Sequence, residues 1–139
     1  MPEIIHAAPR DPEPIDILKS AVAWAKQAGH RVRIGSFGVS VASTHGPRRW
    51  ELDPLERDAG VDPLGAVILW MQPPALDPTA AAAQALGVDA VWVAGLIAGL
   101  DLSPKESRWL QARCRGVYLK AFEMGALLRI HVLSFRGQA

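Results

Sequence analysis

The first apolar pattern of the chain repeats at steps of three and four residues, which is typical of one side of a helix. Pro14 suits a first helical position, and Gly29 suits a C-terminal stop. The pattern therefore predicts a helix from Pro14 to Gly29. The residues of its apolar side are Ile15, Ile17, Leu18, Ala21, Val22, Trp24, Ala25 and Ala28.

From His30 the period changes to two, which predicts strands. The phase of the alternation flips at Gly35 and Ser36, so these residues form either a bulge, which we favour, or a tight hairpin turn. Residues 44–47 (THGP) predict a turn, and residues 48–52 predict the returning strand. Together these segments predict a small antiparallel sheet of two or three strands.

Residues 53–64 are polar and contain two Asp-Pro steps, so they predict a loop. The wholly apolar run from Ala66 to Met71 contains β-branched Val67 and Ile68, which favours a buried strand. A helical turn is the alternative, because a short apolar run carries no period that separates the two.

Three helices are predicted in the C-terminal half. Asp77 can cap the first and Gly87 can end it, while Asp89 can cap a second helix that is apolar on all sides and should be buried. A capping box at residues 103–106 (SPKE) predicts the start of a long third helix. Its heptad-like seam is Leu110, Cys114, Val117, Ala121, Met124 and Leu128, with Tyr118, Leu119 and Phe122 off that line. Residues 130–135 are either a last strand or a frayed end.

These elements predict an α+β fold. An N-terminal helix and the small sheet pack on a C-terminal bundle of three helices that includes the long last helix. Residues 1–13 hold three prolines and few residues to bury, so we expect an extended or disordered arm before a single domain at 14–139.

The net charge of +1 is unevenly distributed. Residues 1–104 carry a balance of −4, whereas residues 105–139 carry +5. The single cysteine excludes an internal disulfide and suits a reducing cytoplasm, where we expect the protein. No signal peptide and no apolar run of membrane-spanning length occurs, so no membrane partner is expected.

Residues 78–99 have the spacing of a helix-turn-helix, with a turn at Gly87. The second helix, however, reads AVWVAGLI over residues 90–97 and has no side chain to bond a base edge. A pair of core helices explains the same spacing. The small and anchoring positions of the motif are Ala83, Gly87, Val88, Val93 and Leu96.

The first candidate interaction surface combines arginines with a tryptophan: Arg31, Arg33, Arg48, Arg49 and Trp50. Such a set suits phosphate or single-stranded nucleic acid, although nearby acids favour a solvated strand face. We expect Trp50 to be exposed and to act as an interface anchor. The apolar faces that carry Trp24, Trp70, Trp92 and Trp109 predict core positions for those four.

Two further surfaces lie on the C-terminal helices. A basic helix face is formed by Arg108, Arg113, Arg115 and Lys120, which we interpret as solvated or as a docking surface for an acidic partner. Gly95 and Gly99 predict a close helix–helix contact, either within the chain or across a dimer.

Motifs for catalysis are absent from the sequence. The four histidines have no partner at a metal-ligand spacing, Cys114 lies on an apolar seam, and neither a nucleophile elbow nor a phosphate loop occurs. We therefore expect no metal and no cofactor, and we lean against an enzyme. An enzyme whose residues are dispersed in sequence is the third hypothesis.

The favoured function is a small non-enzymatic binding module that acts through protein–protein contacts, with a homodimer as one form. The alternative is a nucleic-acid-binding or regulatory protein that uses residues 78–99. The runs at 60–66 (GVDPLGA) and 92–101 (WVAGLIAGLD) resemble stretches of small bacterial or phage proteins. That resemblance implies no activity.

Overall fold

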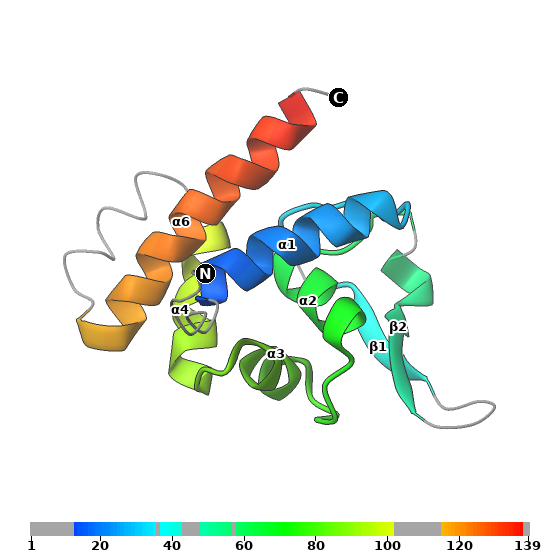
Figure 1. Ribbon diagram of the computed structural model, residues 1–139, viewed down its shortest axis with the longest axis horizontal. Coiled ribbons are helices and arrows are strands. Elements are labelled where there is room, and N and C mark those ends of the chain that lie inside the picture. The colour runs from blue at the N-terminus through cyan, green and yellow to red at the C-terminus, as the bar shows by residue number, and fades with distance from the viewer. Residues whose placement is uncertain (1–12, 36, 43–47, 57, 102–114, 138–139) are drawn as a thin grey trace, which may run out of the picture.

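The computed structural model describes residues 13–35, 37–42, 48–56, 58–101 and 115–137. Within them lie five α-helices and a two-stranded antiparallel sheet (Figure 1), which confirms the predicted α+β class with a long last helix. The elements are α1 (Pro14–Gln27), β1 (Val39–Ala42), β2 (Arg49–Leu52), the 3-10 turn η2 (Pro54–Glu56), α2 (Pro63–Met71), α3 (Pro78–Leu86), α4 (Ala90–Asp101) and α6 (Gly116–Gly137).

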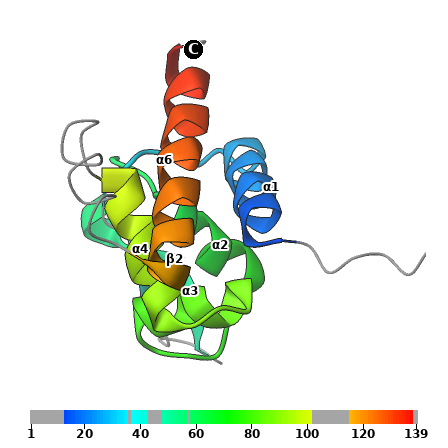
Figure 2. The same ribbon diagram turned by 90° about the vertical axis from the view of Figure 1, so that its left-hand side faces the viewer.

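The helices pack mainly as two pairs, α1 on α2 and α4 on α6, with α3 between α2 and α4. The hairpin of β1 and β2 contacts α2 at the end of the molecule away from α6 (Figure 1). Seen from the side, α6 stands between α1 and α4, and no described element lies in front of it (Figure 2). The sheet is therefore not the layer that covers the outer face of α6.

The predicted first helix is confirmed as α1, with Leu18, Ala21, Val22 and Ala25 buried. The predicted sheet is confirmed for two strands, which pair Val41 with Trp50. The alternation at Arg31–Ile34, in contrast, does not add a third strand. Val32 instead forms an isolated parallel bridge with Val61, because residues 60–61 run directly beside residues 31–33.

The predicted strand at residues 66–71 is wrong, because this run is part of helix α2. The Asp62 carboxylate accepts a hydrogen bond of 2.8 Å from the Gly65 N–H, and Pro63 stands at the first helical position. These are standard helix-start signals. Residues 63–69 are all buried, so the helix shows no polar side from which a period could be read.

Both predicted caps in the following segment are confirmed. Asp77 accepts from the Ala80 N–H at 3.0 Å, and Asp89 accepts from the Trp92 N–H at 3.0 Å. Gly87 ends α3 in the left-handed conformation, with φ of 69°. The axes of α3 and α4 are bent by 103° across this turn.

The last helix differs from its prediction at both ends. Among the described residues it begins at Gly116, and the proposed capping box, Leu110 and Cys114 lie outside them. The segment 130–135 is neither a strand nor a frayed end, because α6 continues to Gly137. The fully buried side chains of α6 are Ala121, Phe122, Leu128 and Val132, whereas Val117 of the predicted seam is exposed.

Candidate functional site

Trp50 is buried, with 3% of its surface exposed, so the prediction of an exposed anchor is wrong. Its indole N–H donates to the Pro73 carbonyl at 3.1 Å. Its backbone N–H donates to Oε1 of Gln72 at 2.7 Å, and its carbonyl accepts from Nε2 of the same side chain at 2.9 Å. Strand alternation, which turns Arg49 and Glu51 outward and Trp50 inward, is the signal that identifies this burial.

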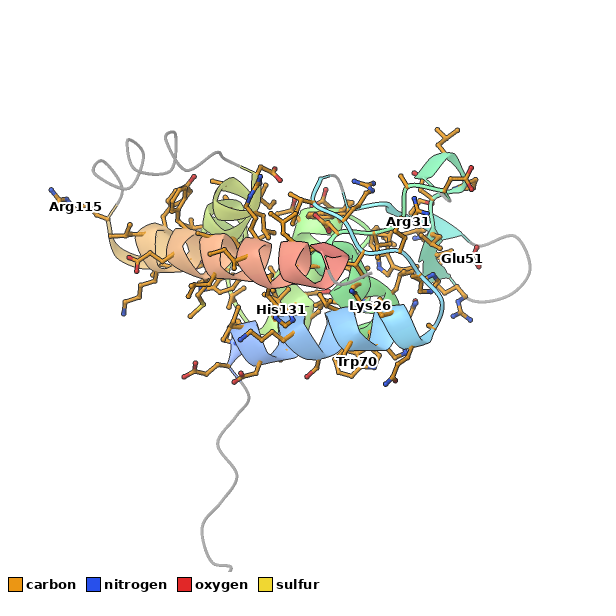
Figure 3. The ribbon with its side chains drawn as sticks, turned by 90° about the horizontal axis from the view of Figure 1, so that it is seen from above. Lys26, Arg31, Glu51, Trp70, Arg115 and His131 are labelled. Carbon is orange, nitrogen blue, oxygen red and sulfur yellow. The ribbon has the colours of Figure 1, made fainter. Side chains whose placement is uncertain are left out.

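The structure brings together only part of the predicted arginine surface. Arg48 and Arg49 are exposed and line a hollow of about 260 Å³ beside Pro73, Pro74 and Leu76. The Arg31 carbonyl accepts from the Val61 N–H, the Arg33 N–H donates to the Val61 carbonyl, and Arg33 interacts electrostatically with Asp62. Figure 3 labels Arg31 and Glu51 on this side of the molecule.

The unit at 78–99 has helix-turn-helix geometry, since 103° lies within the usual range for two helices of that motif. Val93 and Leu96 are buried as anchors. The side of α4 that faces outward is formed by small and apolar residues, with Ala90, Val91 and Ala94 exposed. Residues 90–97 of α4 therefore present no hydrogen-bonding side chain of the kind that reads bases.

The predicted small-residue contact is made within the chain. A Cβ on Gly95 would lie 2.6 Å from the Tyr118 carbonyl oxygen, and one on Gly99 would overlap the Phe122 carbonyl oxygen. Gly125 meets Gly99 from the other helix. These glycines bring α4 and α6 into backbone contact.

Only half of the predicted basic helix face is described. Arg108 and Arg113 lie outside the described residues, while Arg115 and Lys120 are exposed near the start of α6. Arg115 projects from the end of the helix (Figure 3). Arg129, in contrast, turns inward and donates to the Leu100 carbonyl at 2.6 Å.

The sequence did not predict the apolar residues that the outer face of α6 exposes. Leu127 is 63% exposed, Ile130 is 62% exposed and Leu133 is 41% exposed. Residues three apart on a helix lie near one another, so these three form a continuous row, here called the α6 stripe. Phe122, which lies off the predicted seam, is buried.

A second apolar surface lies between α1 and α2. Trp70 and Met71 end α2 and are 41% and 47% exposed, so the core position predicted for Trp70 is wrong. Trp92 is buried as predicted, Trp24 is half-buried, and Trp109 lies outside the described residues. Trp70 and Met71 are the two residues by which α2 extends beyond its buried segment, which explains their exposure.

Asp62 is a buried ionisable group that the sequence analysis did not predict. The Asp62-Pro63 step opens α2 just as Asp77-Pro78 opens α3, and the step was therefore an available signal for a helix start at this position. Burial raises the pKa of the Asp62 carboxyl from 3.8 to about 7. The Gly65 N–H and the charge of Arg33 oppose that rise in pKa, whereas Asp101 adds to it. Partial burial also raises the pKa of Asp101, against the opposing charge of Arg129.

On the other side of α6, partial burial lowers the pKa of His131, and the positive charges of Lys19 and Lys26 lower it further. Figure 3 shows His131 beside α1, close to the label of Lys26. His131 therefore lies where α6 packs beside α1, near the lysines of that helix.

Within the described segments, no group of three His, Cys, Asp or Glu side chains could hold a metal ion. No single described helix is long and apolar enough to cross a membrane, and α3 with α4 reaches that length and hydropathy only as a sharply bent pair. Comparisons with protein-family models, with curated proteins and with solved structures find no match to this chain.

Proposed function

We propose that this protein is a binding module that acts through protein–protein contacts and pairs with a second copy through the α6 stripe. The observation that carries the proposal is the row of Leu127, Ile130 and Leu133 on the outer face of α6. Single exposed leucines are ordinary, but a continuous apolar row on one helix is typical of an interaction site.

The opposite face of α6 already belongs to the core, through Ala121, Leu128 and Val132. A helix with apolar residues on both faces needs a covering layer on each side. The sheet contacts α2 instead, and α1 and α4 flank α6 without crossing its outer face (Figure 2). None of the described elements forms a layer over this face, and a second copy supplies one most simply, because identical patches related by a two-fold axis close on themselves.

Sedimentation velocity of the purified chain at micromolar concentration tests this proposal. The chain has a mass of 15.0 kDa, and we expect a species of twice that mass. Ile130→Glu should yield the monomer, because a charge in the middle of the row cannot be buried unpaired. Val91→Glu is the matched control, since Val91 is also an exposed β-branched aliphatic residue, on α4. A monomer for the unmodified chain, or dissociation by the α4 variant alone, would contradict the proposal.

Nucleic-acid binding is the second candidate, and the 103° bend between α3 and α4 is the observation that favours it. The apolar outer side of α4 weighs against it, as do the carboxylates of Asp77 at the start of α3 and of Asp89 and Asp101 at the two ends of α4. We therefore rank it below the protein–protein module.

A further inference from the structure

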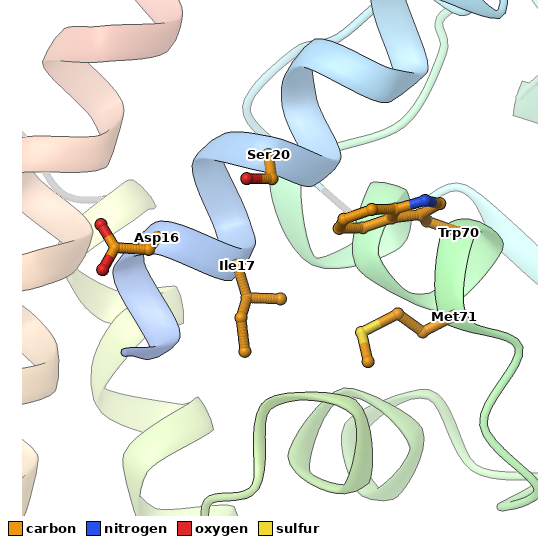
Figure 4. A pocket seen from close by; sticks show the side chains of 5 residues that line it. All are labelled: Asp16, Ile17, Ser20, Trp70 and Met71. Carbon is orange, nitrogen blue, oxygen red and sulfur yellow. The ribbon is translucent and has the colours of Figure 1, made fainter. Parts of the chain in front are cut away.

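A hollow of about 330 Å³ opens between the first turns of α1 and the last turn of α2 (Figure 4). Its lining is almost wholly apolar. Figure 4 shows Ile17 of α1 facing Met71 across the gap, with the ring of Trp70 beside them, while the carboxylate of Asp16 points away from the ring. The lining residues are Asp16, Ile17, Ser20, Trp70 and Met71.

The hollow leaves two large apolar side chains partly in water, although neighbouring residues of α2 are completely buried. Its volume matches sites that accept a few apolar groups. The serine hydroxyl and the aspartate stand only on the α1 side, so little in the lining would bond a polar ligand. The surface therefore fits aliphatic side chains.

The wall formed by α1 lies where the preceding segment of the chain joins the domain. Glu13 is the first described residue, and Ile17 stands one turn into α1. Residues 1–12 lie outside the described residues, and their sequence, MPEIIHAAPRDP, contains the adjacent pair Ile4 and Ile5.

We propose that Ile4 and Ile5 of this chain occupy the hollow and cover Trp70 and Met71. Residues 6–12 separate the isoleucines from Glu13, and an extended segment of that length spans roughly 20–25 Å. A helix with its side chains is only about 10 Å wide, so the segment can turn back past α1 and reach α2.

Two further features favour this occupant over a separate molecule. Pro9 and Pro12 fix φ in the connecting segment, which reduces the conformational entropy lost when the segment is ordered. The connection is also covalent, so the isoleucines are present at a high effective concentration. The inference is independent of the α6 stripe, which lies on another helix.

Nuclear magnetic resonance of the full chain, with labelled methionine and isoleucine methyl groups, tests the contact directly. We expect nuclear Overhauser effects from the Met71 methyl group to the δ1 methyl groups of Ile4 and Ile5. Ile15 and Ile17 provide the reference within the same spectrum, because they are fixed on α1. Clear effects to Ile17 without any to Ile4 or Ile5 would overturn the proposal.

Trp70 fluorescence gives a second readout, measured as the difference between a chain and its Trp70→Phe form. The double variant Ile4→Asp/Ile5→Asp should raise acrylamide quenching of Trp70 and shift its emission to the red. The matched double variant Ala7→Asp/Ala8→Asp adds the same charge to the same segment and should leave both unchanged. Equal quenching in the two double variants would contradict the assignment.

The same measurement separates this occupant from a second copy. Protection of Trp70 that is insensitive to the isoleucine change but disappears on dilution would place a neighbouring molecule in the hollow and overturn the proposal. Protection that is independent of concentration and lost with Ile4 and Ile5 supports it.

Discussion

The side-chain amide of Gln72 pairs with both backbone polar groups of Trp50, at 2.7 and 2.9 Å. Trp50 stands opposite Val41 in the antiparallel pair. The Asp53 N–H donates to the Gly38 carbonyl, so the backbone polar groups of Asp53 and of every second residue before it, Glu51 and Arg49, point toward β1. In that alternation the backbone of Trp50 points away from β1, toward the outer edge of β2. Gln72 therefore acts as a one-residue substitute for a third strand.

Gln72→Met should destabilise the protein by about 2 kcal/mol, because it keeps most of the side-chain volume and leaves two backbone groups of Trp50 without their partner. Gln84→Met is the control, since that side chain accepts one bond, from the exposed Ala75 N–H. Urea unfolding followed by circular dichroism measures both. Equal midpoints for the two variants would show that the edge pairing adds no stability.

Gly95→Leu should destabilise the fold by about 1–3 kcal/mol, because the added side chain meets the Tyr118 carbonyl and Ala121 on α6. Gly99→Ala should also destabilise, since one methyl group overlaps the Phe122 carbonyl. Ala94→Leu places the same side chain on the exposed side of the same helix and is the control for the added leucine. Thermal unfolding distinguishes them, and unchanged stability of the Gly95 variant would reject this packing.

Folding stability should fall as the pH rises toward neutrality. The raised pKa of Asp62, from 3.8 to about 7, means that the folded protein holds a proton within this window that the unfolded chain has released. Stability from this group is therefore complete below the lower value and is lost as the pH rises through the upper one. Asp101, whose pKa is raised in the same direction, adds to this dependence.

Asp62→Asn should flatten the dependence, because the amide oxygen can still accept from the Gly65 N–H and carries no charge. Urea unfolding at about pH 5 and about pH 8 compares the two proteins across the window of linked protonation. Parallel pH profiles for the variant and the unmodified chain would show that Asp62 does not titrate in this range.

The purified protein should bind duplex and single-stranded nucleic acid weakly at physiological salt, because α4 offers no polar reading surface. Fluorescence anisotropy over a salt series measures this. Tight binding that weakens steeply with salt would favour the second candidate function. Its loss on changing Arg48 and Arg49 to alanine would locate it on β2, and its loss with Arg113 and Arg115 would locate it near the start of α6.

The sequence correctly predicted the helices whose ends are marked by capping residues. Asp77, Gly87 and Asp89 fix the ends of α3 and α4 through bonds within one turn. The strand prediction for residues 66–71 was wrong, because a helix that is buried on every side shows no period and its β-branched residues favour a strand. The Asp62-Pro63 step is the sequence signal that identifies this segment as a helix.

The candidate surfaces were harder to predict, because they depend on what packs against each face. Trp50 follows two arginines and yet is covered by residues 72–73, which are distant in sequence. Leu127 and Ile130 are exposed because the sheet contacts α2 rather than α6. The periodicity of α6 alone contains no information on that choice.

The backbone contact of Gly95, Gly99 and Gly125 has a mechanical consequence. Where two helices touch through their main chains, a sliding or rolling motion of one past the other must pass through steric overlap. This contact fixes the rotation and the position of α6 relative to α4. The direction in which Leu127 and Ile130 face solvent is therefore set by packing within the domain. Binding at this face would then lose little conformational entropy in orienting α6, because the helix is already fixed.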